Sequence, residues 1–220
     1  MSKKVILFGT GNIAEVTYYF LNKSGNYKVV AFTKEKNYIQ DNETKFDLPV
    51  VEFEILEDIY DINEYYLFAP FGATNLNKFR EKIYNKGKKK GFSFITYISP
   101  DARVYTENIG ENCFILENNV IQPYVTIGNN CVLWSGNHIG HHSIIEDHVF
   151  ITSHVVISGN CMIKKYSYLG VNSTIKDNIK IDNSSVIGMS SCITKNTESY
   201  GMYIGIPGKI VKKCDDEINL

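Results

Sequence analysis

The five histidines of this chain lie within a stretch of seventeen residues: His138, His141, His142, His148 and His154. Neutral imidazole accepts a proton near pH 7 and also binds transition metals, so such a cluster suits general base catalysis or a metal site. Histidines that merely face solvent are the third alternative. Which of these side chains can meet depends on the fold, and a repeat in the same region indicates the fold.

A six-residue repeat fills the second half of the chain. Ile or Leu stands at every sixth position from Ile109 to Ile193, fifteen times in succession. The residue four places later is mostly small, as at Cys113 and Cys131, and glycine often follows the aliphatic residue directly. This period predicts a hexapeptide β-helix of about five stacked 18-residue coils, with the aliphatic and small side chains inside. The cysteines at the small position are then expected to be free thiols in the core.

The register of the repeat limits what the histidines can do. His142, His148 and His154 hold the same position in successive hexads and therefore lie at three different corners of the coil. With a rise of about 3.3 Å per residue, neighbouring corners are more than about 10 Å apart. Zinc needs ligands at about 2 Å, so these three cannot share a metal ion within one chain. Only His138, His141 and His142 are local neighbours.

The first part of the chain has a different pattern, with strands and helices in alternation. Apolar runs that end in glycine or turn residues are typical of buried parallel strands. We therefore predict an α/β domain over residues 1–97 and a β-helix domain with a short C-terminal tail over residues 98–220. Strands are expected at residues 5–9, 27–33, 48–53, 64–72 and 92–99, and helices at 12–21 and 74–87.

A glycine-rich loop, GTGNIA at residues 9–14, follows the first strand and opens the first helix. This is the setting of the dinucleotide-binding motif G-x-G-x-x-A. The acidic residue that normally closes the second strand of an NAD site is missing, and Thr33 and Lys34 stand there instead. The loop therefore argues against an NAD-dependent dehydrogenase.

Composition excludes several other classes of protein. The formal net charge of −1 leaves no basic excess for binding nucleic acid or an acidic membrane. No segment is long and apolar enough for a signal peptide or a membrane span, so no membrane insertion is expected. The five cysteines form no CxxC pair and are odd in number. They argue against a zinc ribbon and a disulfide framework, and a reduced cytoplasmic setting is the expectation.

Four stretches together carry a resemblance to a known family. They are GTGNIAE, ISPDARV, IGHHSIIEDHVFITSHVVISGN and YIGIPGK. Over nearly its whole length the chain resembles the bacterial sugar acyltransferases of the PglD/NeuD type. The resemblance implies a Rossmann-like N-terminal domain that holds a nucleotide-linked sugar, followed by a left-handed β-helix that binds acetyl-CoA. It also implies a homotrimer with active sites in the clefts between β-helices.

The resemblance assigns roles to two residues of the repeat. His141, two residues after an aliphatic position, matches the catalytic general base, and Gly159, eighteen residues later, matches the backbone donor to the oxyanion. An imidazole with a pKa of about 6.5 is mostly neutral near pH 7 and can remove the proton of an attacking amine. No covalent acyl-enzyme is required, and no metal is expected.

The chain departs from the family at His142, where the relatives usually carry an acidic residue. An acid at this place could orient the imidazole of His141, whereas a second histidine would repel a protonated neighbour. Glu117, Asn118 and Asn137 are open alternatives for the missing partner.

The resemblance also implies binding residues. Those expected at acetyl-CoA are Gly170, Gly188, Ile206, Pro207 and Lys209, although Lys209 could equally be a solvated tail residue. Those expected at the nucleotide-linked sugar are Gly9, Gly11, Asn12, Gly72 and Asn75. His138 and His142 would lie on the acceptor side, together with Trp134, for which simple packing is the alternative.

The predicted function is transfer of acetyl from acetyl-CoA to the amino group of a nucleotide-linked amino-deoxysugar. The product would feed a surface glycan such as O-antigen lipopolysaccharide or capsule. An O-acetyltransferase is the nearest alternative, and a trimeric metalloenzyme like the γ-class carbonic anhydrases is more remote. A scaffold without catalytic activity would need neither the histidines nor the glycine loop. The nucleotide, whether UDP, dTDP or GDP, stays open.

Overall fold

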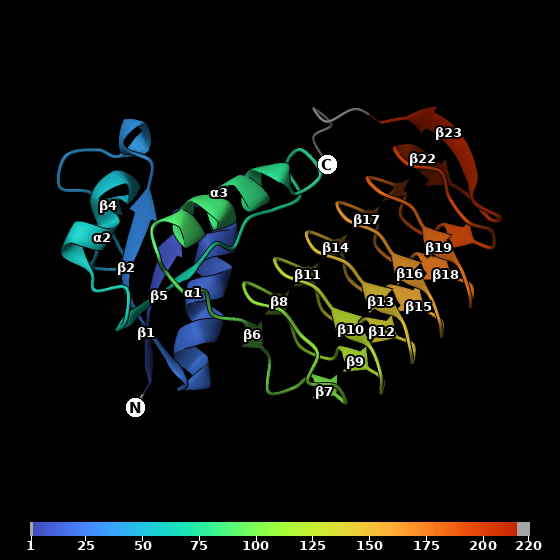
Figure 1. Ribbon diagram of the computed structural model, residues 1–220, viewed down its shortest axis with the longest axis horizontal. Coiled ribbons are helices and arrows are strands. Elements are labelled where there is room, and N and C mark those ends of the chain that lie inside the picture. Colours follow the sequence, from blue (N-terminus) through green and yellow to red (C-terminus); the bar gives the residue numbers. More distant parts are fainter. Residues whose placement is uncertain (1, 215–220) are drawn as a thin grey trace. The chain divides into compact units, whose positions relative to one another are not determined.

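The computed structural model describes residues 2–214 and divides the chain into two compact units (Figure 1). The first contains the chain up to Gly72 together with Lys82–Ile95, and the second contains Ala73–Glu81 together with the chain from Thr96. The predicted division had one boundary, after residue 97. The structure differs in that residues 73–81 group with the second unit. Each unit is described by itself below.

The first unit is built on one five-stranded sheet with the strand order β3-β4-β2-β1-β5. The pairs among β4, β2, β1 and β5 are parallel, and β3 is antiparallel to β4. The last four residues of β1 form a continuous apolar run because this part of the parallel strand is buried on both faces, and Val5, Ile6 and Leu7 have no exposed surface. The strands are β1 (Lys3–Phe8), β2 (Tyr27–Lys34), β3 (Thr44–Lys45), β4 (Leu48–Glu52) and β5 (Tyr65–Phe68).

The helices connect these strands. α1 begins directly after the glycine loop and ends at Gly25, whose φ of 71° lies in the left-handed region that glycine adopts without strain. The helices are α1 (Asn12–Ser24), α2 (Leu56–Ile59) and α3 (Lys78–Lys89), with 3₁₀ turns η1 (Lys36–Tyr38) and η2 (Phe53–Ile55).

Two predicted elements differ from the structure. The helix expected at residues 74–87 begins only at Lys78, because Asn75, Leu76 and Asn77 all have positive φ and form a left-handed turn. The strand expected at residues 92–99 is not continuous. It makes one isolated bridge, from Phe94 to Leu67, and its last part, β6, joins a sheet of the second unit.

The second unit consists of three sheets, in which the strands from β8 to β21 are two residues long and recur every eighteen residues (Figure 1). All neighbouring strands are parallel except β22 and β23. One sheet contains β6 (Tyr97–Ile98), β8 (Phe114–Ile115), β11 (Val132–Leu133), β14 (Phe150–Ile151), β17 (Tyr168–Leu169), β20 (Val186–Ile187), β22 (Gly201–Ile204) and β23 (Lys209–Lys213). The second contains β7 (Arg103–Val104), β9 (Val120–Ile121), β12 (His138–Ile139), β15 (Val156–Ile157), β18 (Thr174–Ile175) and β21 (Cys192–Ile193). The third contains β10 (Thr126–Ile127), β13 (Ile144–Ile145), β16 (Met162–Ile163) and β19 (Lys180–Ile181).

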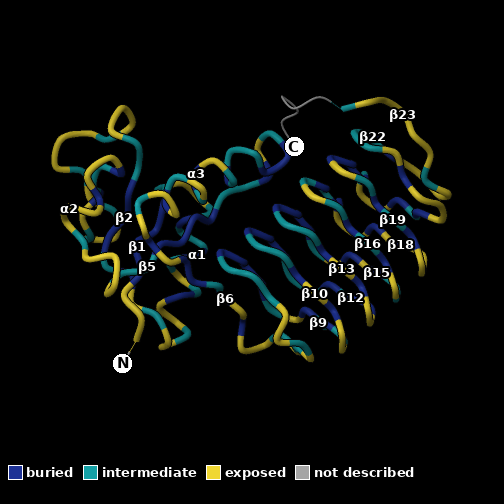
Figure 2. Tube along the Cα trace, in the orientation of Figure 1, coloured by how far each residue is buried: buried dark blue, intermediate teal, exposed yellow. Residues whose placement is uncertain are grey.

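The interior of this β-helix is filled as the repeat predicts (Figure 2). The aliphatic residue of each hexad from Ile115 onward is buried, and so is the small residue four places later. Cys113, Cys131 and Cys161 occupy that small position as buried free thiols. The core is therefore one continuous column of side chains, and each coil is stabilised by its two neighbours.

The corners of the β-helix have a left-handed backbone. The residue three places after each aliphatic position has a φ between 55° and 64°, from Asn112 to Ser190, with Gly136 at 79°. Asparagine and histidine are enriched among the non-glycine residues that adopt this conformation. His142, His148 and His154 are thus corner residues, in agreement with their predicted register. No helix among the described residues is long and apolar enough to cross a membrane.

Candidate active site

His141 and Gly159 lie against each other on consecutive coils of the β-helix. A Cβ atom at Gly159 would be 2.7 Å from Cε1 and 2.8 Å from Nε2 of His141, so the imidazole occupies the space of a side chain. The backbone fixes this stacking, because the Asn160 N–H donates a 2.9 Å hydrogen bond to the His141 carbonyl. Only glycine at position 159 leaves the ring in place.

The backbone N–H of Gly159 is an open donor beside this ring. The backbone N–H groups on either side of it are already hydrogen-bonded. The N–H of Ser158 donates to Ile175 O at 3.1 Å, and the N–H of Asn160 donates to His141 O. The Gly159 N–H makes no hydrogen bond to another described residue. A base and a free backbone donor therefore meet at one corner, which suits a reaction that removes a proton and develops an oxyanion.

The ring of His141 contacts a second imidazole. Nδ1 of His141 is 3.1 Å from Nδ1 of His142, and the two rings are nearly perpendicular, at 87°. The Tyr124 ring lies over His142 with a centroid distance of 4.7 Å. The backbone N–H of His141 donates to Gln122 Oε1 at 2.8 Å. His142 itself is thus the ring partner of His141.

The alternatives that the sequence left open are placed elsewhere. Glu117 accepts a hydrogen bond from Ser135 Oγ at 2.7 Å. The Asn137 side chain bonds to Trp134 O and to the Val155 N–H. Neither these two residues nor Asn118 has a hydrogen bond to His141 among the described residues.

The remaining histidines have different surroundings. His138 lies on β12, paired in register with Val120 and Val156 on the neighbouring strands. His154 repeats the stacking of histidine on glycine, since a Cβ at Gly136 would be 2.6 Å from its Nδ1. Residues 2–214 contain no group of three His, Cys, Asp or Glu side chains arranged to hold a metal ion.

His148 belongs to a buried polar ladder and not to the open corner. Asn130 Oδ1 accepts hydrogen bonds from Arg80 Nε at 2.6 Å and from Asn112 Nδ2 at 2.7 Å. The Asn130 Nδ2 must then donate to Nδ1 of His148, at 2.9 Å. This assigns the proton of neutral His148 to Nε2, which lies 3.4 Å from Glu81 Oε1.

The ladder holds the segment Ala73–Glu81 within the second unit. Asn77 Nδ2 donates to the His148 carbonyl at 2.7 Å, and the Arg80 guanidinium has no exposed surface. Burial lowers the pKa of Arg80 to about 10. Burial also lowers the pKa of His148, although the Glu81 carboxylate acts in the opposite direction. The role of His148 is therefore structural.

This burial predicts a dependence of stability on pH. The folded pKa of His148 lies below its ordinary value of about 6.5, so the unfolded chain binds the proton more readily. The stabilisation that comes from keeping His148 neutral is complete above a pH of about 6.5, and it is lost progressively as the pH falls below that value. We expect the free energy of unfolding of wild type to drop more between pH 7.5 and 5.5 than that of His148→Asn, which tolerates the corner backbone. Equal drops in denaturant titrations would contradict this account of His148.

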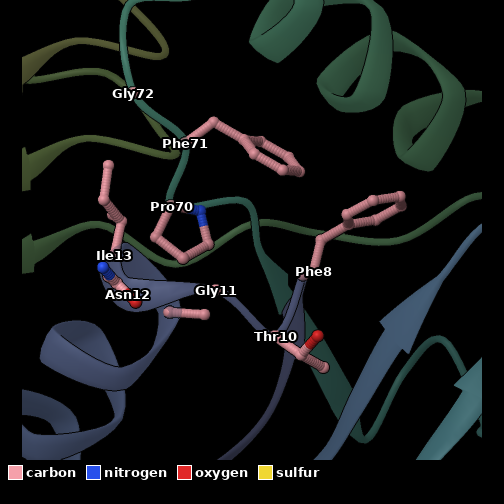
Figure 3. Close-up of a pocket in the computed structure, with 10 residues that line it drawn as sticks. Phe8, Thr10, Gly11, Asn12, Ile13, Pro70, Phe71 and Gly72 are labelled. Carbon is pink, nitrogen blue, oxygen red and sulfur yellow. The ribbon is translucent and has the colours of Figure 1, made fainter. Parts of the chain in front are cut away.

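The first unit carries its own pocket, with a volume of about 410 Å³, at the start of α1 (Figure 3). Gly9 has a φ of 93°, which requires glycine, whereas Gly11 has an ordinary extended backbone. A Cβ at Gly11 would meet no atom within 4 Å, so nothing in the protein explains this glycine. Phe8, Gly9, Thr10, Gly11, Asn12, Ile13, Ala14, Pro70, Phe71 and Gly72 line the pocket.

Most of the residues predicted for the nucleotide-linked sugar lie in this pocket, but Asn75 does not. Gly9, Gly11, Asn12 and Gly72 are brought together there, and α1 begins with no side-chain cap on its first N–H groups. Asn75 is not part of the lining and groups with the second unit. The aromatic side of the pocket, formed by Phe8 and Phe71, is a feature that the motif does not encode.

Other predicted site residues have a packing role in the structure. Trp134 packs against the apolar cluster of Ala73, Val132 and Phe150. It follows β11, in a different sheet from the β12 strand that precedes His141.

The glycines and the C-terminal turn predicted for acetyl-CoA are placed as follows. A Cβ at Gly170 would overlap the backbone of the next coil, at 2.7 Å from Ile187 O, and one at Gly188 would be 3.0 Å from Ile204 Cγ1. Packing between coils therefore requires glycine at position 170, whereas a side chain at position 188 needs a small shift of Ile204. The bond between Ile206 and Pro207 is cis, and Lys209 begins the exposed strand β23.

The fold is similar to that of several solved acetyltransferases. A family model described as bacterial transferase hexapeptide (six repeats) matches residues 108–141 and 124–159. The acetyltransferase domain of PglB from Neisseria gonorrhoeae is 18% identical, with a TM-score of 0.82, over 96% of this chain and 100% of that chain. WeeI from Acinetobacter baumannii is 16% identical, with a TM-score of 0.82 and the same coverage. Comparison with curated protein sequences gives no significant match.

A third similar structure is PerB from Caulobacter crescentus, in complex with CoA and GDP-perosamine. It is 19% identical, with a TM-score of 0.70, over 95% of this chain and 97% of that chain. The repeat match and these structures confirm the left-handed β-helix that the resemblance predicted. This chain has the fold of the hexapeptide-repeat transferases and is similar, within them, to the acetyltransferase domain of PglB, to WeeI and to PerB.

Proposed function

We propose that this protein transfers acetyl from acetyl-CoA to the amino group of a nucleotide-linked amino-deoxysugar, with His141 as general base. The observation that carries the proposal is the His141 imidazole lying against Gly159, whose N–H is open at the same corner. Similar folds are solved with the two kinds of substrate: PglB with acetyl coenzyme A, and PerB with CoA and GDP-perosamine.

The reaction balances with this one base. The sugar amine attacks the thioester carbonyl carbon, a C–N bond forms, and the carbonyl π electrons move to oxygen. Nε2 of His141 takes the proton that the nitrogen loses. When the tetrahedral intermediate collapses, the C–S bond breaks and the departing sulfur receives that proton. The products are the amide and CoA thiol, and His141 returns to its neutral state.

The Gly159 N–H supplies the second requirement of the reaction, which is a hydrogen-bond donor to the oxyanion. The oxygen of the tetrahedral intermediate carries a negative charge that the thioester lacks, and a fixed backbone donor stabilises that charge selectively. Because the N–H is held by the coil and needs no rearrangement, its stabilisation is available as the charge forms. Base and donor thus act on opposite ends of the same addition step.

The first unit is proposed to be a Rossmann-like domain that holds the nucleotide-linked sugar. Its pocket lies at the N-terminus of α1, where uncapped N–H groups and the helix dipole favour an anion such as a diphosphate. β2 ends with Thr33 and Lys34, and the Thr33 hydroxyl donates to Val51 O, so neither residue offers a carboxylate to a ribose. This supports a sugar nucleotide over a nicotinamide cofactor.

Gly11 gives this pocket a direct test. Since a Cβ at this position would have no protein atom within 4 Å, Gly11→Val is expected to leave the thermal midpoint within about 2 °C of wild type. A side chain in the space of the ligand is expected to weaken binding of the nucleotide-linked sugar by at least about tenfold. Calorimetry on both proteins checks this. Unchanged affinity would place the ligand elsewhere.

The remaining assignments follow the family resemblance. Gly170, Gly188, Ile206, Pro207 and Lys209 are proposed to border acetyl-CoA, and His138 with His142 the acceptor side. Asn75 and Trp134 are weaker candidates, given where they lie. The protein is proposed to act as a cytoplasmic homotrimer in the synthesis of a surface glycan such as O-antigen.

The test of the function is thiol release from acetyl-CoA with a panel of nucleotide-linked sugars. The panel pairs each amino sugar with its hydroxyl analogue, on UDP, dTDP and GDP. Release with an amino sugar and none with its hydroxyl partner supports N-acetylation. Release only with hydroxyl acceptors would replace the proposal with an O-acetyltransferase, and release with none would refute it.

A further inference from the structure

The contact between His141 and His142 has a chemical consequence, because it joins two like atoms. The two Nδ1 atoms are 3.1 Å apart, which is a hydrogen-bond distance. One of them must carry a proton and the other must offer a lone pair, since two lone pairs or two protons at this distance repel. The pair of neutral rings therefore has two arrangements.

The two arrangements differ in which nitrogen of His141 is basic. If His141 donates, its proton sits on Nδ1 and the lone pair sits on Nε2, beside Gly159. If His142 donates, His141 carries its proton on Nε2 and presents no base at the Gly159 corner. Only the first arrangement can take a proton from an amine at that corner.

We propose that His142 is a positioning residue that accepts a hydrogen bond from the Nδ1–H of His141 and so keeps Nε2 free as the base. The proposal rests on the proposed function and deepens it. It also accounts for the departure from the family pattern, since the lone pair of the His142 imidazole accepts the hydrogen bond that a carboxylate oxygen at this place could accept.

The structure holds the His142 ring for this task. Its backbone is fixed in the left-handed region, with a φ of 58°, and its N–H donates to Pro123 O at 3.3 Å. The Tyr124 ring lies over the imidazole at 34° to its plane. Among the described residues, the rings in contact with His142 are those of Tyr124 and His141.

The test compares two substitutions of His142. His142→Asn keeps an acceptor, because the amide Oδ1 can take the hydrogen bond, and asparagine is frequent at these left-handed corners. His142→Ala keeps no acceptor. We expect kcat within about threefold of wild type for the asparagine variant, which restores the acceptor, and a fall of about 10- to 100-fold for alanine.

A readout without substrate separates this inference from the proposed function. Long-range ¹H–¹⁵N spectra at pH 8 report which nitrogen of each imidazole is protonated, and His141→Asn identifies the His141 signals. We expect Nδ1–H on His141 in wild type and in His142→Asn, and a shift toward Nε2–H in His142→Ala. A protein with this pattern and no acetyl transfer would refute the function alone. Nε2–H on His141 in wild type, or no change in His142→Ala, would overturn the inference.

Discussion

His141→Ala is expected to lower kcat for acetyl transfer by about 10²- to 10⁴-fold, with KM for both substrates little changed. The reason is that the variant binds the substrates but has no group at the Gly159 corner to accept the amine proton. His141 is exposed and its ring packs on a glycine, so its removal leaves the buried column of the β-helix intact. The thermal midpoint should stay close to that of wild type.

The matched control for this prediction is His154→Ala. His154 is also an exposed histidine that lies over a glycine of the β-helix, but at another corner. It should retain activity within about threefold. Steady-state thiol release for both variants makes the comparison. Equal losses in the two would show that the effect is structural, and full activity of His141→Ala would move the base to another residue.

Gly159→Ala is expected to reduce kcat by about 10- to 100-fold without unfolding the protein. The added Cβ would lie 2.7 Å from Cε1 of His141, so the imidazole must move aside. Its displacement costs little stability because the ring is exposed and the chain around it is unchanged. A misplacement of about 1 Å in a catalytic group can cost about 10²-fold in rate.

Gly136→Ala is the control for this second prediction. It would push the His154 ring in the same manner, with the Cβ 2.6 Å from Nδ1, at a corner without the proposed chemistry. Its φ of 79° adds backbone strain, so this control is expected to be the less stable variant and the more active one. An active Gly159→Ala would show that the position of the His141 ring does not limit the reaction.

The β-helix could be predicted from the sequence because its rule is local and strictly repeated. Every interior position is set by its place in the hexad, so Ile115 and Cys131 could be assigned to the core by counting. The same count put His141 and Gly159 on consecutive coils, eighteen residues apart. Left-handed corners rich in asparagine are consistent with the same register.

Contacts between side chains could not be predicted in this way. The repeat places His142 and His148 in equivalent positions, yet one is exposed beside His141 and the other is 6% exposed within the Asn130 ladder. The difference comes from Arg80 and its neighbours in the segment 73–81. In the sequence this segment has the periodic pattern of an ordinary helix, so its contacts with the β-helix could not be predicted. The left-handed turn formed by Asn75, Leu76 and Asn77 likewise has no periodic pattern in the sequence from which it could be predicted.

The pocket of the first unit could be predicted from the sequence in part. The glycine motif located one side of it correctly, because a strand, a tight turn and a helix N-terminus are encoded within a few consecutive residues. Phe71 and Pro70 come from the end of a different strand, and only the parallel pairing of β1 with β5 brings them to the same edge. Asn75 was expected there too, but it is not among the residues that line the pocket.

The central claim is that the acetyl group moves from acetyl-CoA to a sugar nitrogen. The most direct measurement incubates the protein with acetyl-CoA labelled with ¹³C at the carbonyl and a nucleotide-linked amino sugar labelled with ¹⁵N at the amine. The account predicts a product in which the two labels are directly bonded, seen as a one-bond ¹³C–¹⁵N coupling. A ¹³C-labelled product without that coupling, or no labelled sugar with any acceptor of the panel, would contradict it.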